Sequence, residues 1–225
     1  MQEDKKWLFF RIGLVIAFIS LIFYGIYINN LNKLDLSKYN KDQIITSTAD
    51  NGGFGDLVLG NPNAKVVIIE YGDYQCPACG SYREKFEKLV TTYPDKVALV
   101  FRQYIIPGHT DARAASATAL AAARQGKFWQ MHNKLFSSLA EWNGKSNQRA
   151  KIFENYARDL GLDIDKYHQD LESEDITKKI SFDMTLGKAH QLEATPTIVV
   201  NGEKVDYEIW SKDDKFANFL TEKLK

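Results

Sequence analysis

The sequence predicts an α/β fold, and three features of the residue pattern indicate it. Residues 66–71 (VVIIEY) and 97–106 (VALVFRQYII) are apolar, β-branched runs typical of buried strands. Between them, apolar residues at helical spacing predict a helix over 79–93. A strand–helix–strand unit of about 40 residues has parallel strands, so these two strands are expected to lie parallel in one sheet.

The other elements follow in order along the chain. Helical patterns occupy 112–124, 127–139, 148–160, 164–171 and 173–191, so a helical block covers about 107–190. A strand pattern returns at 197–200. The Asn201-Gly202 dipeptide is the strongest short signal for a hairpin, and it predicts a partner strand over 204–207. An amphipathic helix over 212–225 is expected to close the domain.

The amino-terminal segment predicts a membrane anchor. Residues 12–28 (IGLVIAFISLIFYGIYI) carry no charge, and residues 7–10 extend the apolar run across Arg11. A helix of about 20 residues spans the hydrocarbon core of a bilayer. Because Lys5, Lys6 and Arg11 precede the span, the positive-inside rule places the short tail in the cytoplasm and the rest of the chain outside.

A cleaved signal peptide is the alternative interpretation of this segment. Such peptides have an apolar core of about 7–15 residues, followed by small residues before the cut. The flank at 29–33 reads NNLNK and offers no such pattern, which favours an uncleaved single-pass anchor. With either interpretation the rest of the chain is expected in an oxidising compartment, where disulfide chemistry belongs.

The predicted organisation therefore has three parts: a cytoplasmic tail and transmembrane anchor (1–28), a linker (29–55) and a folded domain (56–225). The linker is polar and ends in the turn-forming run NGGFG. The chain holds 29 basic and 29 acidic residues. This balance excludes the strong basic excess typical of nucleic-acid binders, so no nucleic-acid partner is expected.

The chain has two cysteines, Cys76 and Cys79, three positions apart. A structural disulfide stabilises chiefly by closing a long loop, and this pair closes almost none. A zinc site needs four ligands at short spacings, whereas the four histidines are scattered along the sequence. A redox pair remains as the favoured interpretation, with no metal and no cofactor expected.

The position of the cysteines predicts unequal roles for them. Cys76 follows the first strand and begins the helix, where open α/β sheets place their chemistry. Unpaired N–H groups and the positive dipole end favour its nucleophilic thiolate. Cys79, one turn further, is expected to be the shielded resolving thiol. Pro77 suits the first helical turn because its missing N–H is not needed there, and Asp73 and Tyr74 are expected to shape the preceding loop.

Glu70 is a charged residue inside an apolar strand, six positions before Cys76. A buried carboxylate near a thiol pair can hold or pass a proton. The alternative is a strand residue that pairs with Arg102 or reaches solvent. His109, at the entry to the helical block, either faces the site or packs against the helix entry.

Thr195 and Pro196 directly precede the later strand. Proline cannot continue a central ladder, so Pro196 is expected to start that strand. From the residues alone, an ordinary trans peptide bond at strand entry is the favoured interpretation.

Four segments, taken in their order along the chain, resemble the DsbA-like disulfide oxidoreductases. They are 70–79 (EYGDYQCPAC), 101–104 (FRQY), 125–132 (QGKFW followed by Met131-His132) and 194–197 (ATPT). They span residues 66 to about 205, most of the predicted domain. A CxxC motif alone is weak, but the four segments together are specific to the family.

The resemblance implies a thioredoxin fold with an inserted helical subdomain. It implies that Cys76 is the attacking thiol, that Cys79 is its partner, and that Pro196 is a cis proline that faces the pair. It further implies thiol–disulfide exchange with unfolded or reduced proteins outside the cytoplasm of a bacterium, and a membrane redox partner of DsbB type.

The leading hypothesis is an oxidase that donates its disulfide to substrates folding outside the membrane. One departure from the family matters: its best-known strong oxidants have histidine between the proline and the second cysteine, where this chain has Ala78. A less oxidising couple, in a reductase or isomerase fed by a membrane electron donor, is the second hypothesis. The third is a holdase or binding module that uses the fold and not the thiols.

Overall fold

The computed structural model describes residues 14–15, 18–22 and 34–225. The chain divides into two units, residues 1–35 and 36–225. Of the predicted membrane span, 12–13, 16–17 and 23–28 lie outside the described residues, and the described part is helical with exposed side chains. Within the described ranges, no helix is both long enough and apolar enough to cross a bilayer.

The second unit contains both strands and helices. The strands are β1 (Leu57–Gly60), β2 (Val66–Gly72), β3 (Val97–Gln103), β4 (Thr197–Val200) and β5 (Glu203–Val205). The helices around them are η1 (Leu36–Lys38), α2 (Pro77–Thr92), α9 (Tyr207–Trp210) and α10 (Asp213–Leu224). The helices between β3 and β4 are α3 (Ala112–Arg124), α4 (Phe128–Ser137), α5 (Leu139–Trp142), α6 (Arg149–Asp159), α7 (Ile164–Leu171) and α8 (Glu174–Ala189).

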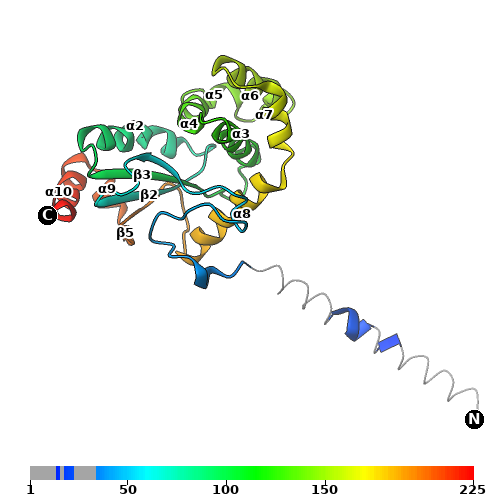
Figure 1. Cartoon of the computed structure of the whole chain (residues 1–225), viewed down its shortest axis with the longest axis horizontal. Helices are drawn as coiled ribbons and strands as arrows, with labels where there is room; N and C mark the ends of the chain where they lie inside the picture. The colour runs from blue at the N-terminus through cyan, green and yellow to red at the C-terminus, as the bar shows by residue number, and fades with distance from the viewer. Residues whose placement is uncertain (1–13, 16–17, 23–33) are drawn as a thin grey trace, which may run out of the picture. The chain divides into compact units, whose positions relative to one another are not determined.

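The strands form one mixed sheet in the order β1-β3-β2-β4-β5. β2 and β3 are parallel, with Val66 opposite Val97, as the strand–helix–strand pattern predicts. β4 runs antiparallel to β2, and β5 pairs with β4 across a hairpin whose residues Asn201 and Gly202 both have positive φ. The predicted α/β fold of thioredoxin type with a helical insertion is thus confirmed for the described unit (Figure 1).

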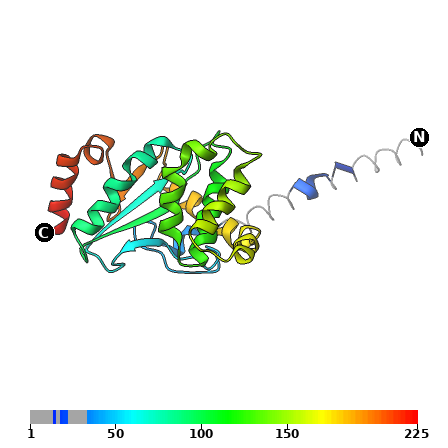
Figure 2. The same ribbon diagram turned by 90° about the horizontal axis from the view of Figure 1, so that it is seen from above.

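Helices cover both faces of this sheet. Alternate residues of a strand point to opposite faces, and Ile68 of β2 packs with Phe86 and Val90 of α2. Figure 1 shows α8 on the opposite side of the sheet from α2. Figure 2 shows the helices α3–α7 gathered at one end of the unit, with α10 at the other.

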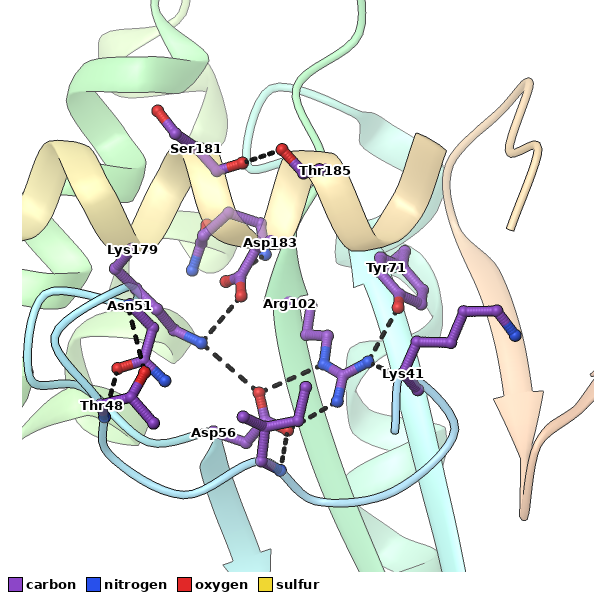
Figure 3. Close-up of polar contacts among 12 residues, drawn as sticks. Lys41, Thr48, Asn51, Asp56, Tyr71, Arg102, Lys179, Ser181, Asp183 and Thr185 are labelled. Atoms are coloured by element: carbon purple, nitrogen blue, oxygen red, sulfur yellow. Dashed lines mark hydrogen bonds and ion pairs between the residues drawn. The ribbon is translucent and has the colours of Figure 1, made fainter. Parts of the chain in front are cut away.

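The predicted linker, 29–55, is wrong from residue 36 onward, because residues 36–55 pack on the domain. Ile45 and Phe54 are buried. Buried Arg102 of β3 donates hydrogen bonds to the carbonyl groups of Lys41 and Gln43, at 2.6 and 2.8 Å (Figure 3). Two features therefore hold residues 36–55 on the domain: the buried apolar side chains of Ile45 and Phe54, and the buried guanidinium of Arg102, which requires hydrogen-bond acceptors from this segment.

Several element ends differ from the prediction. β3 ends at Gln103 and not at Ile106, because the Ile106 N–H donates to the Asp73 carboxylate and not to a neighbouring strand. Tyr207 begins α9 instead of ending β5, and β1 was not predicted. The apolar residues after Gln103 belong to a partly buried loop. An apolar run in a sequence looks the same whether it forms a buried strand or a buried loop, so the sequence did not show where β3 ends.

Candidate active site

The two cysteines lie at the carboxyl end of β2, where α2 begins. Cys76 is the N-cap residue of α2, and Pro77 is its first helical residue. The Cys76 N–H donates to the carbonyl of Asp73 at 3.0 Å, which sets the entry of the chain into the helix. Both thiols are free, and Cys79 is fully buried.

The surroundings of Cys76 favour its thiolate. A hydrogen bond from the Cys79 thiol is the main cause that lowers the pKa of Cys76 to about 5, against the opposing effect of burial. The Thr195 hydroxyl, which has no other hydrogen-bond partner in the described structure, lowers this pKa as well. The N–H groups of Cys79 and Ala78 act in the same direction.

Cys79 has the opposite character. Burial, followed by its hydrogen bond to Cys76 and the nearby charge of Glu70, raises the pKa of Cys79 well above that of an ordinary thiol. At neutral pH the pair therefore consists of a thiolate at the helix terminus and a protonated thiol one turn inside.

The Thr195–Pro196 peptide bond is cis, as the resemblance implies, and not the trans bond favoured by the residues alone. This loop faces the cysteine pair, since the Cys76 sulfur lies 3.4 Å from the Thr195 carbonyl oxygen, to which the protonated form of Cys76 donates. A cleft of about 390 Å³ adjoins the contact. Among the residues that line it are Ala78, Tyr82, Thr195, Pro196, Tyr207 and Trp210.

Glu70 lies in the middle of β2 and is only 2% exposed. Its Oε1 has no hydrogen-bond partner among the residues that the structure describes. Burial is the main cause that raises the pKa of Glu70 to about 8, and the charges of Cys76 and Glu87 raise it further. The alternative expectations for Glu70 are wrong: it is not open to solvent, and Arg102 pairs with Asp56, at 2.7 Å.

Asp73 connects the cysteine loop with the entry to the helical block. Its carboxylate accepts hydrogen bonds from the Gln75 N–H at 2.7 Å and the Ile106 N–H at 2.9 Å. The same carboxylate lies 2.7 Å from Nδ1 of His109. His109 therefore supports the loop through Asp73, and Tyr74 contributes a hydrogen bond between its hydroxyl and Nδ1 of His132, at 3.1 Å.

Sequence reasoning missed a group of polar residues on the α2 side of Glu70. Gln103, Glu87 and Asn133 each bring a buried polar atom without a partner in the described part of the chain. One signal was available in the sequence. Cys79, Arg83 and Glu87 are spaced four apart, which places them along one side of a helix. Within the described ranges, no group of three His, Cys, Asp or Glu side chains could hold a metal ion.

The fold and the thiol pair together define an enzyme of thiol–disulfide exchange. The family described as "Thioredoxin" matches residues 54–219, well over half of the chain, and the chain belongs to this family.

Several solved structures are similar to this chain. Oxidised BdbD from Bacillus subtilis is 22% identical, with a TM-score of 0.64, over 81% of this chain and 98% of that chain. A thioredoxin-like oxidoreductase from Silicibacter pomeroyi DSS-3 is 29% identical, with a TM-score of 0.59, over 74% of this chain and 92% of that one. The α-DsbA1 of Wolbachia pipientis is 20% identical, with a TM-score of 0.63, over 75% and 90%.

Curated relatives match about two thirds of this chain. The chain is 32% identical to the Na(+)/H(+) antiporter NhaA 1 of Mycolicibacterium gilvum over 152 residues, which are 66% of this chain and 24% of that protein. The antiporter NhaA 1 of Mycobacterium sp. (strain KMS) is 30% identical over the same shares. The chain spans about a quarter of the length of these relatives.

Proposed function

We propose that this enzyme is an oxidase that transfers its disulfide to reduced or unfolded proteins outside the cytoplasm. The observation that carries the proposal is the environment of Cys76. Its pKa is about 5, it stands at the N-terminus of α2, and the Cys79 thiol and the N–H groups of Ala78 and Cys79 donate hydrogen bonds to its thiolate. A low pKa stabilises the reduced enzyme and thereby makes its disulfide a stronger oxidant.

The size of this effect indicates a moderate oxidant. Lowering the pKa of Cys76 from 9.0 to about 5 stabilises the reduced form by about 2 kcal/mol at neutral pH, after a discount for solvent screening. For a two-electron couple this raises the potential by about 40 mV. Ala78 supplies no imidazole that could add to it.

The reaction consists of two thiol–disulfide exchanges. A substrate thiolate attacks the Cys76 sulfur of the Cys76–Cys79 disulfide, forms a mixed disulfide with Cys76 and releases Cys79 as a thiolate. A second substrate thiolate then attacks the substrate sulfur of the mixed disulfide, and Cys76 leaves. The low pKa of Cys76 makes it a good leaving group. Both substrate thiols become one disulfide, and both enzyme thiols are reduced.

Three other residues have roles in this proposal. Glu70, protonated at neutral pH because of its raised pKa of about 8, gives its proton to the departing Cys79 thiolate. Thr195 and Pro196 hold the substrate chain beside Cys76, in the cleft that they line. The motif residues Pro77 and Ala78 shape the first turn of α2, whose N–H groups face the Cys76 thiolate.

The redox potential tests the oxidase proposal. We expect a potential clearly above that of thioredoxin, about −270 mV, when the purified protein is equilibrated with glutathione buffers. A potential near or below that value would contradict the oxidase and favour the reductase or isomerase hypothesis. The Cys76→Ser variant separates catalysis from a holdase role, because unchanged cellular function in that variant would contradict every reaction through the thiols.

We also propose an uncleaved anchor, with the N-terminus in the cytoplasm and the catalytic domain outside a bacterial cell membrane. The uncharged run at 12–28 supports it, as do exposed apolar side chains within the described part, at Leu14, Val15, Phe18, Ile19, Leu21 and Ile22. A membrane redox partner of DsbB type would then restore the disulfide. Protease accessibility in spheroplasts tests this topology, and a mature chain lacking residues 1–28 would contradict it.

A further inference from the structure

Unpartnered polar atoms gather between the sheet and the helices α2 and α4. Six of them are buried without a hydrogen-bond partner in the described structure: Glu70 Oε1, Arg83 Nε, Glu87 Oε1, Gln103 Nε2 and Oε1, and Asn133 Oδ1. Buried polar atoms are nearly always paired, either with protein or with ordered water. So many unpartnered atoms around one carboxyl group indicate a site that holds water, because a buried water takes about three hydrogen bonds.

Electrostatic interactions connect the groups at the inner end of this polar group, and hydrogen bonds connect those at its outer end. At the inner end, Glu70 acts on the pKa of Cys79, and Glu87 acts on the pKa of Glu70. At the outer end, the Asn133 Nδ2 donates to Glu87 Oε2 at 3.4 Å, and Arg83 Nη1 donates to the Asn133 carbonyl at 3.2 Å. Glu87 is half-buried and reaches solvent, whereas Glu70 does not.

The order of the residues on α2 agrees with a path along that helix. Cys79, Arg83 and Glu87 follow one another at intervals of four, so they form one line on its surface. Gln103 lies two residues after Phe101, which pairs with Glu70 in the parallel register, and strand alternation places Phe101 and Gln103 on the same face.

We propose that Glu87 is the outer end of a proton path that runs through water held between β2, β3, α2 and α4, and joins Glu70 and the Cys79 thiol to solvent. The inference rests on the proposed thiol–disulfide function. Glu87 does not touch the sulfurs; it acts through Glu70 and is a positioning residue for the proton.

Each proton step balances with the exchange step. When the S–S bond between Cys76 and Cys79 breaks, the Glu70 carboxyl passes its proton to the Cys79 thiolate and becomes a carboxylate. Solvent then protonates the Glu87 carboxylate, and the proton passes through water in the site to the Glu70 carboxylate, which leaves Glu87 again as a carboxylate. In the reverse direction Cys79 loses its proton by the same route. The dithiol–disulfide couple supplies both electrons.

The other ionisable groups around Glu87 come from two helices. On α2, Arg83 lowers the pKa of Glu87 and Glu84 raises it, while burial, the main cause, raises it as well. On α4, His132 is neutral at neutral pH, since burial lowers its pKa to about 3. Tyr74, hydrogen-bonded to His132, remains protonated because burial raises its pKa.

The first test is a pH titration of the Glu70 carboxyl by NMR in the reduced full chain. Removing the charge of Glu87 with Glu87→Gln should lower the pKa of Glu70, because a like charge raises it. The control is Glu84→Gln, at an exposed position of the same helix, which should leave the pKa of Glu70 unchanged. An unchanged Glu70 titration in Glu87→Gln would overturn the inference. Water cross-peaks to the Gln103 amide are expected, and their absence would overturn it too.

The second test is kinetic. Glu87→Gln should slow the Cys79-dependent release of a mixed disulfide with glutathione by about tenfold and shift its pH profile, with the Cys76 thiolate titration unchanged. In a Glu70→Gln background, Glu87→Gln should have no further effect, and an additive loss would overturn the path. A wild-type protein without any exchange activity would contradict the proposed function alone, since the NMR titration decides the Glu70–Glu87 link without turnover.

Discussion

The two faces of the central sheet bury charge in opposite ways. On the α8 face, Arg102 is fully buried and pairs with Asp56 at 2.7 Å and the Tyr71 hydroxyl at 2.8 Å. Lys179 completes the group through Asp56 and Asp183 (Figure 3). We call Asp56, Arg102, Lys179 and Asp183 the clasp, because they join the segment before β1 to β3 and α8.

On the α2 face, one residue away along each strand, Glu70 and Gln103 are also buried, but Glu70 Oε1 and both polar side-chain atoms of Gln103 have no hydrogen-bond partner in the described structure. Paired buried charges hold one protonation state, and breaking such a pair is costly. An unpaired buried carboxyl changes protonation near neutral pH, as a proton carrier must. The comparison separates a group that stabilises the domain from a group suited to chemistry.

The largest expected effect comes from breaking the clasp. Arg102→Met leaves Asp56 without its main cationic partner and removes the donor to the segment at 41–43, so the free energy of unfolding should fall by about 3–5 kcal/mol. Urea unfolding measures it. The control is Arg158→Met, whose ion pair with Glu154 lies at the surface, where solvent screens it, so this variant should change the free energy of unfolding little. Equal losses in the two variants would contradict the role of the clasp.

The second effect is a pH dependence of stability that Glu70 causes. Because the folded pKa of Glu70 is raised from 4.5 to about 8, its favourable contribution is complete below pH 4.5 and is lost as the pH rises through 8. The loss has a slope of up to about 1.4 kcal/mol per pH unit. Glu70→Gln should flatten this slope and stabilise the reduced domain by about 2 kcal/mol at the alkaline end.

Within the clasp, Asp56 has the opposite sign in the same measurement. The pKa of Asp56 is lowered by Arg102 and Lys179 against the larger opposing effect of burial. Its contribution is present above its ordinary pKa of 3.8 and is lost as the pH falls through the lower folded value. Glu70→Gln should therefore leave the loss of stability at acid pH unchanged. If this variant changed the free energy of unfolding only at acid pH, the alkaline loss would not come from Glu70 and the acid loss would not come from Asp56.

The smallest expected effect concerns Cys76 itself. Since the Cys79 thiol is the main cause of its low pKa, Cys79→Ala should raise the pKa of Cys76 from about 5 by about one pH unit or more. Thr195→Val should raise it less. Ultraviolet absorbance of the thiolate measures both, and a larger shift in Thr195→Val than in Cys79→Ala would reverse the order of causes.

Much of the fold and the core of the site could be predicted from the sequence. The order of strands and helices follows from local periodicity, because each element buries one side of itself. The helix-terminal position of Cys76 is also local, since it needs only a strand, a turn and the start of a helix. Glu70 could be identified as a candidate site residue because an ionisable side chain is unexpected within an apolar strand.

What the sequence by itself determined, then, is the sheet with its inserted helices, the cysteine pair and the carboxyl group six residues before it. Only the tertiary structure decided which carboxylate pairs with Arg102, that residues 36–55 belong to the domain, and that Glu87 and Gln103 surround Glu70. The reason is physical: Asp56 lies 46 residues from Arg102 along the chain, and Glu87 lies near Glu70 only because α2 packs on the sheet. Periodicity places a residue on a face, and packing across the whole fold selects the groups that it meets there.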